Sequence, residues 1–293
     1  MDPLAIAAII GTIATVIGVG VAYLQLKQAK TLKESERRPM ADGGTLKQIL
    51  ERKLLRVGLF HNPPLIDYTD TGNTVEGTGR YADILRAFAR THSLQIKWCP
   101  TKLSEAIHAV TERKVDCYAC IMLSDVRYRE CDFVGLLHSM PVVGVARKRE
   151  QSVKVPSDLT NAHNIKVAVC QGEIGHHVAT TVLRIPAHRL LETNAFDISE
   201  IVAQVYAGNA TVALADGISC KRMMKTPRAK RELKLVFADP PILYVPNGFM
   251  IAKDEKEFGA WLDAGIRSAF VALGGHKGDA SLRVELENSI TTL

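Results

Sequence analysis

The feature that most constrains the fold is an alternation of strand-like and helix-like segments that occurs twice along the chain. Apolar runs of strand length at residues 54–60, 94–98 and 115–123 are separated by apolar residues at helical spacing at 82–88 and 104–113. The same order returns at 165–170, 177–183, 189–191, a helix that starts at 197, and 211–215. Strands that alternate with helices build parallel sheets. We therefore predict an α/β fold of two lobes, each with a largely parallel sheet.

The segments that follow the second unit contain no third unit of this kind. Strand-like runs at 233–238 and 248–253 come first. An amphipathic helix follows, and a last helix starts near residue 279; the apolar residues of the amphipathic helix are Phe258, Trp261, Leu262, Ile266 and Phe270. We expect these segments to return to the first lobe, so that two crossings join the lobes and act as a hinge. The predicted division is lobe 1 from 54–140 and 248–293, and lobe 2 from 141–247.

The chain begins with a long apolar segment in which no residue from 3 to 26 is charged. A helix of this length, at about 1.5 Å rise per residue, spans a bilayer core of about 30 Å with some tilt. A buried core helix and a cleaved signal peptide are the alternatives, but the run is longer than that of a signal peptide and its cations follow it. We predict a transmembrane anchor at 1–26, with the lipid bilayer as its partner.

Basic residues gather directly after this apolar segment. Nine Lys and Arg but four Asp and Glu lie between residues 27 and 56, while the whole chain has a formal net charge of +6. The body is therefore close to neutral, which argues against nucleic-acid binding and favours a basic juxtamembrane linker at 27–53. The positive-inside rule then favours a cytoplasmic body in a single-pass membrane protein. Six cysteines without a secreted-type spacing agree with a reducing compartment.

Two of these cysteines, Cys117 and Cys120, form a C-x-x-C within a strand-like run. Residues three apart in a regular strand point to opposite faces, so we expect a structural role for both. Residues 77–82 fit G-x-G-x-x-A, but no apolar strand precedes them, so we expect no dinucleotide site, and no Cys/His spacing typical of a zinc site is present. We expect no metal and no cofactor.

Two charged residues lie where the third strand of each unit ends. Arg127 follows the first lobe's third strand, and Asp216 ends the second lobe's third strand. Open α/β sheets bind ligands beyond the carboxyl ends of their strands. We therefore expect both side chains to face one cleft, where the guanidinium would bind a carboxylate and the carboxylate would accept an ammonium group. This pair would suit a zwitterionic solute.

Several motifs in this order resemble those of a known family. Residues 124–133 (SDVRYRECDF) follow the pattern T-P-E-R-A-K-x-x-D-F-S, and residues 114–116 follow G-K-V-D-A. Gly172 takes the place of the glycine in V-x-V-Q-x-G-T-T, and residues 248–253 follow Y-G-I-A-V-x-K. From residue 54 to about 286 the chain resembles the bacterial extracellular solute-binding proteins, family 3, which bind polar amino acids for ABC transporters. The resemblance implies the two-lobed type II periplasmic-binding-protein fold and an amino-acid-like ligand.

The resemblance also implies site residues, some of which depart from the family pattern. Arg127 and Asp216 would anchor the ligand, Ser124 and the backbone at Gly172 would supply hydrogen bonds, and candidate walls of the cleft are Leu65, Tyr68, Tyr81 and Met122. Leu65 stands where the family has a stacking aromatic residue, and Met122 stands where it has a hydroxyl.

Glu173 and Ile174 replace two threonines that help to bind a carboxylate. A carboxylate at Glu173 would repel an acidic ligand group at a helix N-terminus. Two interpretations stay open at this point. Either the ligand lacks a free α-carboxylate, or Glu173 pairs with Arg127 across the cleft and holds the lobes shut.

These observations predict a membrane-anchored protein that binds or senses a small polar solute. An extracytoplasmic body, as the family implies, would deliver the solute to a membrane permease, whereas a cytoplasmic body would act with a signalling partner. Two alternatives remain. A dehydratase acting on cyclohexadienyl acids would use His176 or His177 as a general acid. A degenerate domain would bind nothing and act as an interaction scaffold.

Overall fold

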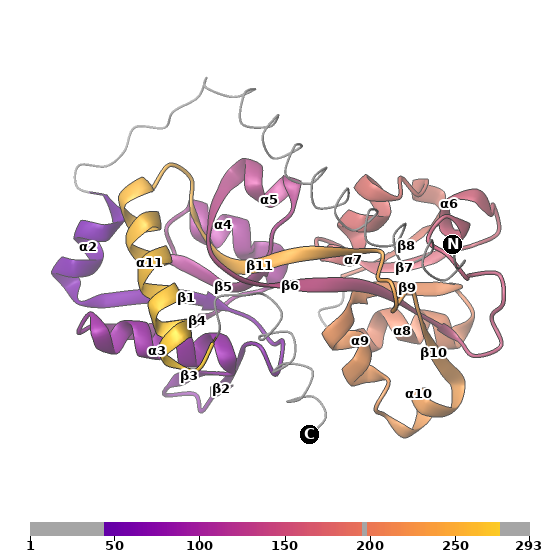
Figure 1. Cartoon of the computed structure of the whole chain (residues 1–293), viewed down its shortest axis with the longest axis horizontal. Helices are drawn as coiled ribbons and strands as arrows, with labels where there is room; N and C mark the ends of the chain where they lie inside the picture. Colours follow the sequence, from indigo (N-terminus) through magenta and orange to yellow (C-terminus); the bar gives the residue numbers. More distant parts are fainter. Residues whose placement is uncertain (1–43, 195–197, 276–293) are drawn as a thin grey trace, which may run out of the picture.

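The computed structural model describes residues 44–194 and 198–275 (Figure 1). The predicted anchor at 1–26, most of the basic linker, the predicted helix start at 197 and the last helix near 279 lie outside the described residues. Among the helices of the described part, none is both long enough and apolar enough to cross a bilayer.

Two lobes lie side by side and share one sheet through two long strands (Figure 1). We use lobe 1 for described residues 44–140 and 248–275, and lobe 2 for described residues 141–194 and 198–247. The first unit of lobe 1 consists of β1 (Leu54–Leu59), α3 (Arg80–Thr91), β4 (Gln95–Pro100), η1 (Leu103–Glu105), α4 (Ala106–Thr111) and β5 (Cys117–Met122). Lobe 1 also contains α2 (Thr45–Arg52), the hairpin of β2 (Asp67–Asp70) and β3 (Val75–Thr78), α5 (Asp125–Glu130) and α11 (Lys256–Ala272).

Lobe 2 repeats the unit. It consists of β7 (Val167–Cys170), α7 (Ile174–His177), the π-helical turn η2 (Val178–Val182), η3 (Ala187–Arg189), β8 (Leu190–Thr193), α8 (Ile198–Ala207) and β9 (Val212–Asp216). Around this unit lie α6 (Asp158–Asn161), α9 (Gly217–Met223), α10 (Pro227–Glu232) and β10 (Leu233–Val236). In both units the first strand pairs in parallel with the second and the third, giving the orders β4-β1-β5 and β8-β7-β9. The two predicted β-α-β-α-β units are confirmed.

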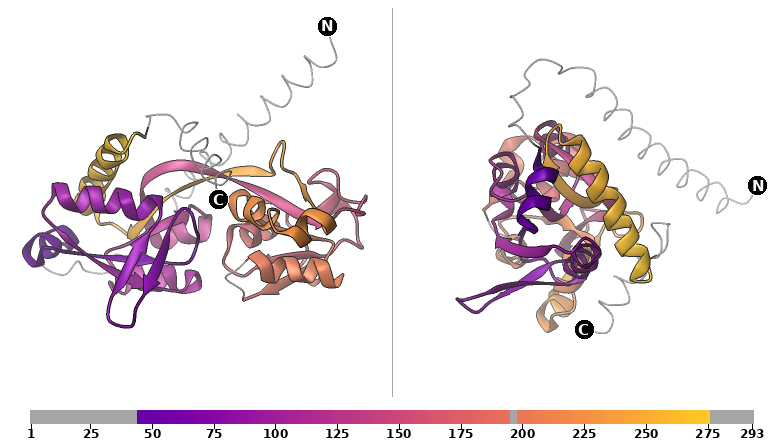
Figure 2. Two further views of the ribbon diagram at one scale, coloured as in Figure 1. Left: turned by 90° about the horizontal axis from the view of Figure 1, so that it is seen from below. Right: turned by 90° about the vertical axis from the view of Figure 1, so that its left-hand side faces the viewer.

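The crossings between the lobes are β6 (Cys131–Arg147) and β11 (Leu243–Ala252). They run antiparallel from Cys131 opposite Ala252 to Val142 opposite Leu243, and Figure 2 shows them passing together from one lobe to the other. In lobe 1 β11 pairs with β5, and in lobe 2 β6 pairs with β9 and β10. The predicted changes of lobe at 140/141 and 247/248 therefore fall inside two continuous strands.

Helices cover both faces of the lobe 1 sheet. α3 and α11 cover one face, and the predicted apolar stripe of α11 is buried there through Phe258, Leu262, Ile266 and Phe270. α4 covers the other face with Ala106, Ala109 and Val110. Trp261 is half-buried and its ring packs edge-on against that of Phe88, with 4.8 Å between ring centroids. Gly208 directly follows α8 and has φ +80°, a left-handed conformation in which glycine commonly ends a helix.

The prediction that Cys117 and Cys120 of the C-x-x-C point to opposite faces of the strand is wrong. Cys120 has φ +58°, and the pairing of β5 with β11 shifts register beside it, so one extra residue bulges from β5. The bulge reverses the alternation, and Cys117 and Cys120 both face the same core. Their thiols are free and buried, and desolvation is the main cause that raises the pKa of each.

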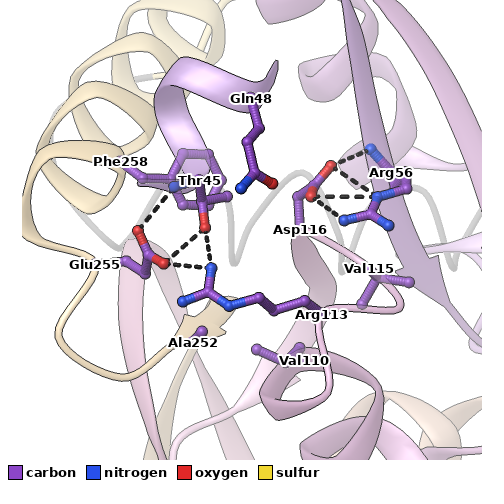
Figure 3. A pocket seen from close by; sticks show the side chains of 10 residues that line it. All are labelled: Thr45, Gln48, Arg56, Val110, Arg113, Val115, Asp116, Ala252, Glu255 and Phe258. Carbon is purple, nitrogen blue, oxygen red and sulfur yellow. Dashed lines mark hydrogen bonds and ion pairs between the residues drawn. The ribbon is translucent and has the colours of Figure 1, made fainter. Parts of the chain in front are cut away.

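The first described helix is fixed to lobe 1 by two buried carboxylates (Figure 3). Glu255 accepts hydrogen bonds from the backbone N–H of Thr45 at 3.2 Å and from its hydroxyl at 2.7 Å, and it pairs with Arg113. Asp116 pairs with Arg52 of this helix, and it also accepts hydrogen bonds from Arg56 of β1, from the backbone N–H at 2.7 Å and the guanidinium at 2.8 Å. Asp116, a residue that carries the family resemblance, therefore has a structural role at the amino end of β5, opposite to the carboxyl ends of the strands.

Candidate functional site

A cleft lies between the lobes, at the carboxyl ends of the strands. Lobe 1 lines it with residues that follow β1 and β5, and lobe 2 lines it with residues that follow β7 and β9. The polar and charged side chains of this lining are His61, Asn62, Arg127, Glu173, Asp216, Ser219 and Arg222. The predicted cation and the predicted anion thus lie in one cleft, and they come from opposite lobes.

Arg127 is placed by a capped helix. The Ser124 hydroxyl accepts a hydrogen bond from the Arg127 backbone N–H at 3.5 Å and begins α5 directly after β5. The Arg127 side chain is buried, and its Nη1 donates to the Met122 carbonyl at 2.8 Å. Its Nη2 donates to the Gly172 carbonyl, also at 2.8 Å. Because Gly172 belongs to lobe 2, this second bond joins the lobes.

A second arginine joins the lobes in the opposite direction. Arg222 of α9, in lobe 2, donates from Nη1 to the carbonyl of Pro63 in lobe 1. Pro63 precedes a cis peptide bond in the loop after β1. Each lobe therefore gives one guanidinium to a backbone carbonyl of the other lobe, and both guanidinium groups belong to residues that line the cleft.

Glu173 is half-buried in the cleft, just before α7. Burial raises the pKa of Glu173 to about 7, the nearby Arg127 guanidinium lowers it, and Asp216 raises it. Arg127 bonds to two carbonyls and forms no ion pair within 4 Å with Glu173. The direct Arg127–Glu173 pair of the second interpretation is therefore replaced by the Arg127–Gly172 bond, with Glu173 close enough to act on Arg127 through charge alone.

Asp216 ends β9 and begins α9. Its Oδ1 accepts a hydrogen bond from the Ser219 backbone N–H at 2.8 Å, and its side chain is buried at the cleft wall. The capping bond uses one carboxylate oxygen and fixes the orientation of the group. The position of Asp216 after the third strand of its unit is the one the sequence predicts.

Three predicted walls of the cleft do not line it. Leu65 is fully buried in the lobe 1 core, because the loop at 62–66 closes on itself through a bond from the Leu65 N–H to the Asn62 carbonyl at 3.0 Å. Tyr81 is also fully buried, and its hydroxyl lies 3.1 Å from Nδ1 of His138. Tyr68 lies on the β2–β3 hairpin and packs against the same core.

The remaining predicted residues have separate places. Met122 lines the cleft and supplies a carbonyl to Arg127. Gly172 supplies the other carbonyl and has φ +79°, a conformation that favours glycine. Ser124 acts as a helix cap and is not part of the cleft lining.

The sequence argument missed several residues of the lining. Phe60, His61 and Asn62 follow β1, and Ser219 and Arg222 lie on the helix that Asp216 begins. The rule that located Arg127 and Asp216, applied to the first strand of lobe 1, would have found the first three. Phe60 supplies an aromatic wall to the cleft, whereas the stacking aromatic residue of the family pattern is replaced by Leu65.

His176 and His177 do not line the cleft. Nε2 of His176 lies 3.4 Å from the Glu192 carboxylate, on the outer side of β8. Burial lowers the pKa of His177, whereas the charge of Asp125 raises it.

Most of the chain matches a known protein family in sequence. Residues 55–286 match the family of bacterial extracellular solute-binding proteins, family 3. The chain belongs to this family. No curated protein matches the chain in sequence.

Solved structures share the fold of this solute-binding family member. An amino acid ABC transporter substrate-binding protein from Streptococcus pneumoniae, bound to L-arginine, is 15% identical, with a TM-score of 0.64 over 83% of this chain and 97% of that one. An ancestral amino acid-binding protein, described as a precursor of cyclohexadienyl dehydratase, is 21% identical, with a TM-score of 0.63 over 77% and 92%.

A third structure belongs to a different kind of protein. A histidine kinase sensor domain with similarity to periplasmic binding proteins is 19% identical, with a TM-score of 0.63 over 80% of this chain and 95% of that one. Together these structures confirm the predicted two-lobed type II periplasmic-binding-protein fold.

Proposed function

We propose that this chain is a solute-binding domain whose two lobes close on a small polar ligand of amino-acid type. The observation that carries the proposal is the placement of Arg127 and Asp216, which come from opposite lobes and line one cleft. A ligand that contacts both would hold the lobes together, and binding would stabilise the closed form. Membership in a solute-binding family and the arginine-bound structural neighbour support the same reading.

Closure offers a way to report ligand binding. Within the described part of the chain, β6 and β11 are the only segments of backbone that cross from one lobe to the other. A change of angle at these strands would therefore move one lobe relative to the other. A partner that contacts both lobes would then distinguish the closed form from the open form.

The side of the membrane on which the body lies decides which of two partners it meets. With an extracytoplasmic body, the partner is a membrane permease, as in the transport systems to which this family belongs. With a cytoplasmic body, which the basic residues at 27–53 favour, the partner is a signalling protein. The sensor domain among the structural neighbours supports a sensing role for this fold.

Thermal unfolding of the full chain with a panel of amino acids, amines and small carboxylates tests the proposal. A ligand at about 100 times its dissociation constant adds about 2.7 kcal/mol to the free energy of unfolding. We expect at least one polar solute to raise the melting temperature, and Arg127→Lys to reduce that shift. A flat panel with a cooperative unfolding transition would instead favour the interaction scaffold. Turnover of a cyclohexadienyl acid that is lost in His177→Ala would favour the dehydratase.

A reporter fused after Leu293 tests the side of the membrane. Activity of a periplasm-dependent reporter would support the permease as partner. Activity of a cytoplasm-dependent reporter would support the signalling partner.

A further inference from the structure

The two arginines of the cleft are already bonded to the protein. Arg127 uses both terminal nitrogens on the carbonyls of Met122 and Gly172, and Arg222 uses Nη1 on the carbonyl of Pro63. Each terminal nitrogen keeps a second N–H, but a ligand carboxylate that bound both nitrogens would have to share them with the two carbonyls that already orient the guanidinium. One of these two bonds also joins the lobes, so such a ligand would share its anchor with a contact of the closed form.

The two carboxylates of the cleft are in the opposite situation. Asp216 uses one oxygen on the Ser219 N–H, and no cation lies within ion-pair distance of it among the described residues. The Glu173 carboxylate accepts a hydrogen bond from the Ile174 backbone N–H but forms no ion pair within 4 Å with a described residue, and burial raises its pKa. Neither carboxylate therefore has a cation in direct contact among the described residues.

The other groups around Glu173 do not place a cation in contact with its carboxylate. The groups that interact with Glu173 through their charge are Arg127, Asp216, Cys120, Cys170 and Tyr118, and the cleft lining adds His61 and Arg222. Burial raises the pKa of both thiols and of the phenol, so these three groups are neutral near pH 7. Among the described residues, Arg127 is the one cation whose charge lowers the pKa of Glu173, and both of its terminal nitrogens already donate to carbonyls.

We infer that the cleft takes a small organic cation without a carboxylate, such as an alkyl amine or a guanidino amine, between Glu173 and Asp216. The inference rests on the proposed function and narrows its ligand. An ammonium or guanidinium group would donate to both carboxylates, and the carbon chain would contact Phe60, Met122 and Leu214. An amino acid of the same side chain would carry an α-carboxylate that shares the Arg127 nitrogens with two carbonyls and is repelled by the Glu173 carboxylate.

Matched pairs of ligands that differ by one carboxylate test the inference directly. We would titrate the full chain by calorimetry with agmatine and arginine, with cadaverine and lysine, and with histamine and histidine. In at least one pair we expect the amine to bind about tenfold or more tightly than the amino acid, which corresponds to about 1.4 kcal/mol. Tighter binding of the amino acid in every pair that binds would overturn the inference and leave solute binding intact. If no pair binds while another solute raises the melting temperature, the inference is again wrong and the proposed function stands. Absence of binding by every solute would overturn both.

Variants and protons give a second readout. Glu173→Gln removes a charge at constant shape. We expect this variant to bind the amine about tenfold more weakly and to bind the matched amino acid more tightly than the wild type does. The same amine titrated near pH 7 in two buffers of different ionisation enthalpy should release protons in the wild type, because a bound cation favours the ionised form of Glu173. An unchanged amine affinity in Glu173→Gln would contradict the assignment of Glu173 to the ligand.

Discussion

The Arg127 guanidinium of lobe 1, which lines the cleft, donates to the Gly172 carbonyl of lobe 2 at 2.8 Å. The guanidinium that the family pattern assigns to a ligand carboxylate therefore also joins the lobes. Closure and carboxylate binding would use the same two nitrogens of Arg127, although each keeps a second N–H. Glu173, in place of a threonine, is the departure from the family pattern that opposes a carboxylate.

Loss of the two arginine bonds should open the cleft. We expect Arg127→Lys and Arg222→Gln, singly and more strongly together, to increase amide hydrogen exchange at residues 170–174, because the bonds to Gly172 and Pro63 hold the lobes against each other. Exchange in the lobe cores should stay as in the wild type. Exchange at 170–174 that is unchanged in the double variant would show that other contacts hold the cleft shut.

Gly172 should matter for ligand binding beyond its backbone strain. Gly172→Ala and Gly72→Ala make a matched pair, since both glycines have φ near +80° and open space where a Cβ would stand. We expect each to lower the free energy of unfolding by about 1 kcal/mol, since a left-handed conformation disfavours alanine. Only Gly172→Ala should also change ligand affinity, because only its carbonyl bonds to Arg127. Equal affinities in the two variants would remove Gly172 from the closure.

Glu173 should make the ligand-free protein less stable as the pH rises. Its pKa is raised from the ordinary value of 4.5 to about 7 in the folded chain, so between these values the folded state holds more protons than the unfolded state. Stability is then fully present below pH 4.5 and is lost as the pH rises through 7. We expect Glu173→Gln to be more stable than the wild type at pH 8, by about 2 kcal/mol, and to differ less from it at pH 5.

Denaturant unfolding at both pH values measures this difference. Glu257→Gln, on the exposed face of α11, is the control and should leave the pH dependence as it is. A pH dependence in Glu173→Gln that matches the wild type would contradict the burial of Glu173.

His138 should act in the opposite direction. Burial lowers the pKa of this histidine to about 3, so it stays neutral in the folded chain at pH values where the unfolded chain takes up a proton. Its contribution is present above pH 6.5 and is lost as the pH falls toward 3. We expect His138→Gln to lose about 2 kcal/mol less than the wild type between pH 7 and pH 5.

The exposed His188 provides the control for this series, measured by the same denaturant unfolding. His188→Gln should reproduce the wild-type pH dependence. A His138→Gln variant with the full wild-type loss would show that His138 is not the group that titrates.

The fold was predictable where local pattern and tertiary packing agree. The two β-α-β-α-β units and the buried face of α11 follow from periodicity, and Asp216 and Arg127 follow from the strand-end rule. β6 was not predicted, although it is the longest strand in the described part of the chain. Its segment contains Gly135, Pro141 and Gly144, which weaken a strand pattern, and its pairing with β11 joins residues about 120 positions apart.

The candidate site was predictable only in part for a similar reason. Leu65 and Tyr81 are apolar and lie near the correct loop, but sequence alone does not tell whether such a side chain faces the core or the cleft. The bonds from Arg127 to Gly172 and from Arg222 to Pro63 join residues 45 and 159 positions apart, and no local pattern encodes them. The bulge at Cys120 depends on its partner strand β11 in the same way.

The most direct test of the central claim is a calorimetric titration of the wild type and of Asp216→Asn with the solute that most raises the melting temperature. Asparagine caps a helix as well as aspartate does, so the variant should keep α9 and lose only the negative charge in the cleft. We predict that Asp216→Asn unfolds cooperatively and binds the solute about tenfold or more weakly than the wild type. Equal affinity in the two proteins would contradict a site built between Asp216 and the opposite lobe.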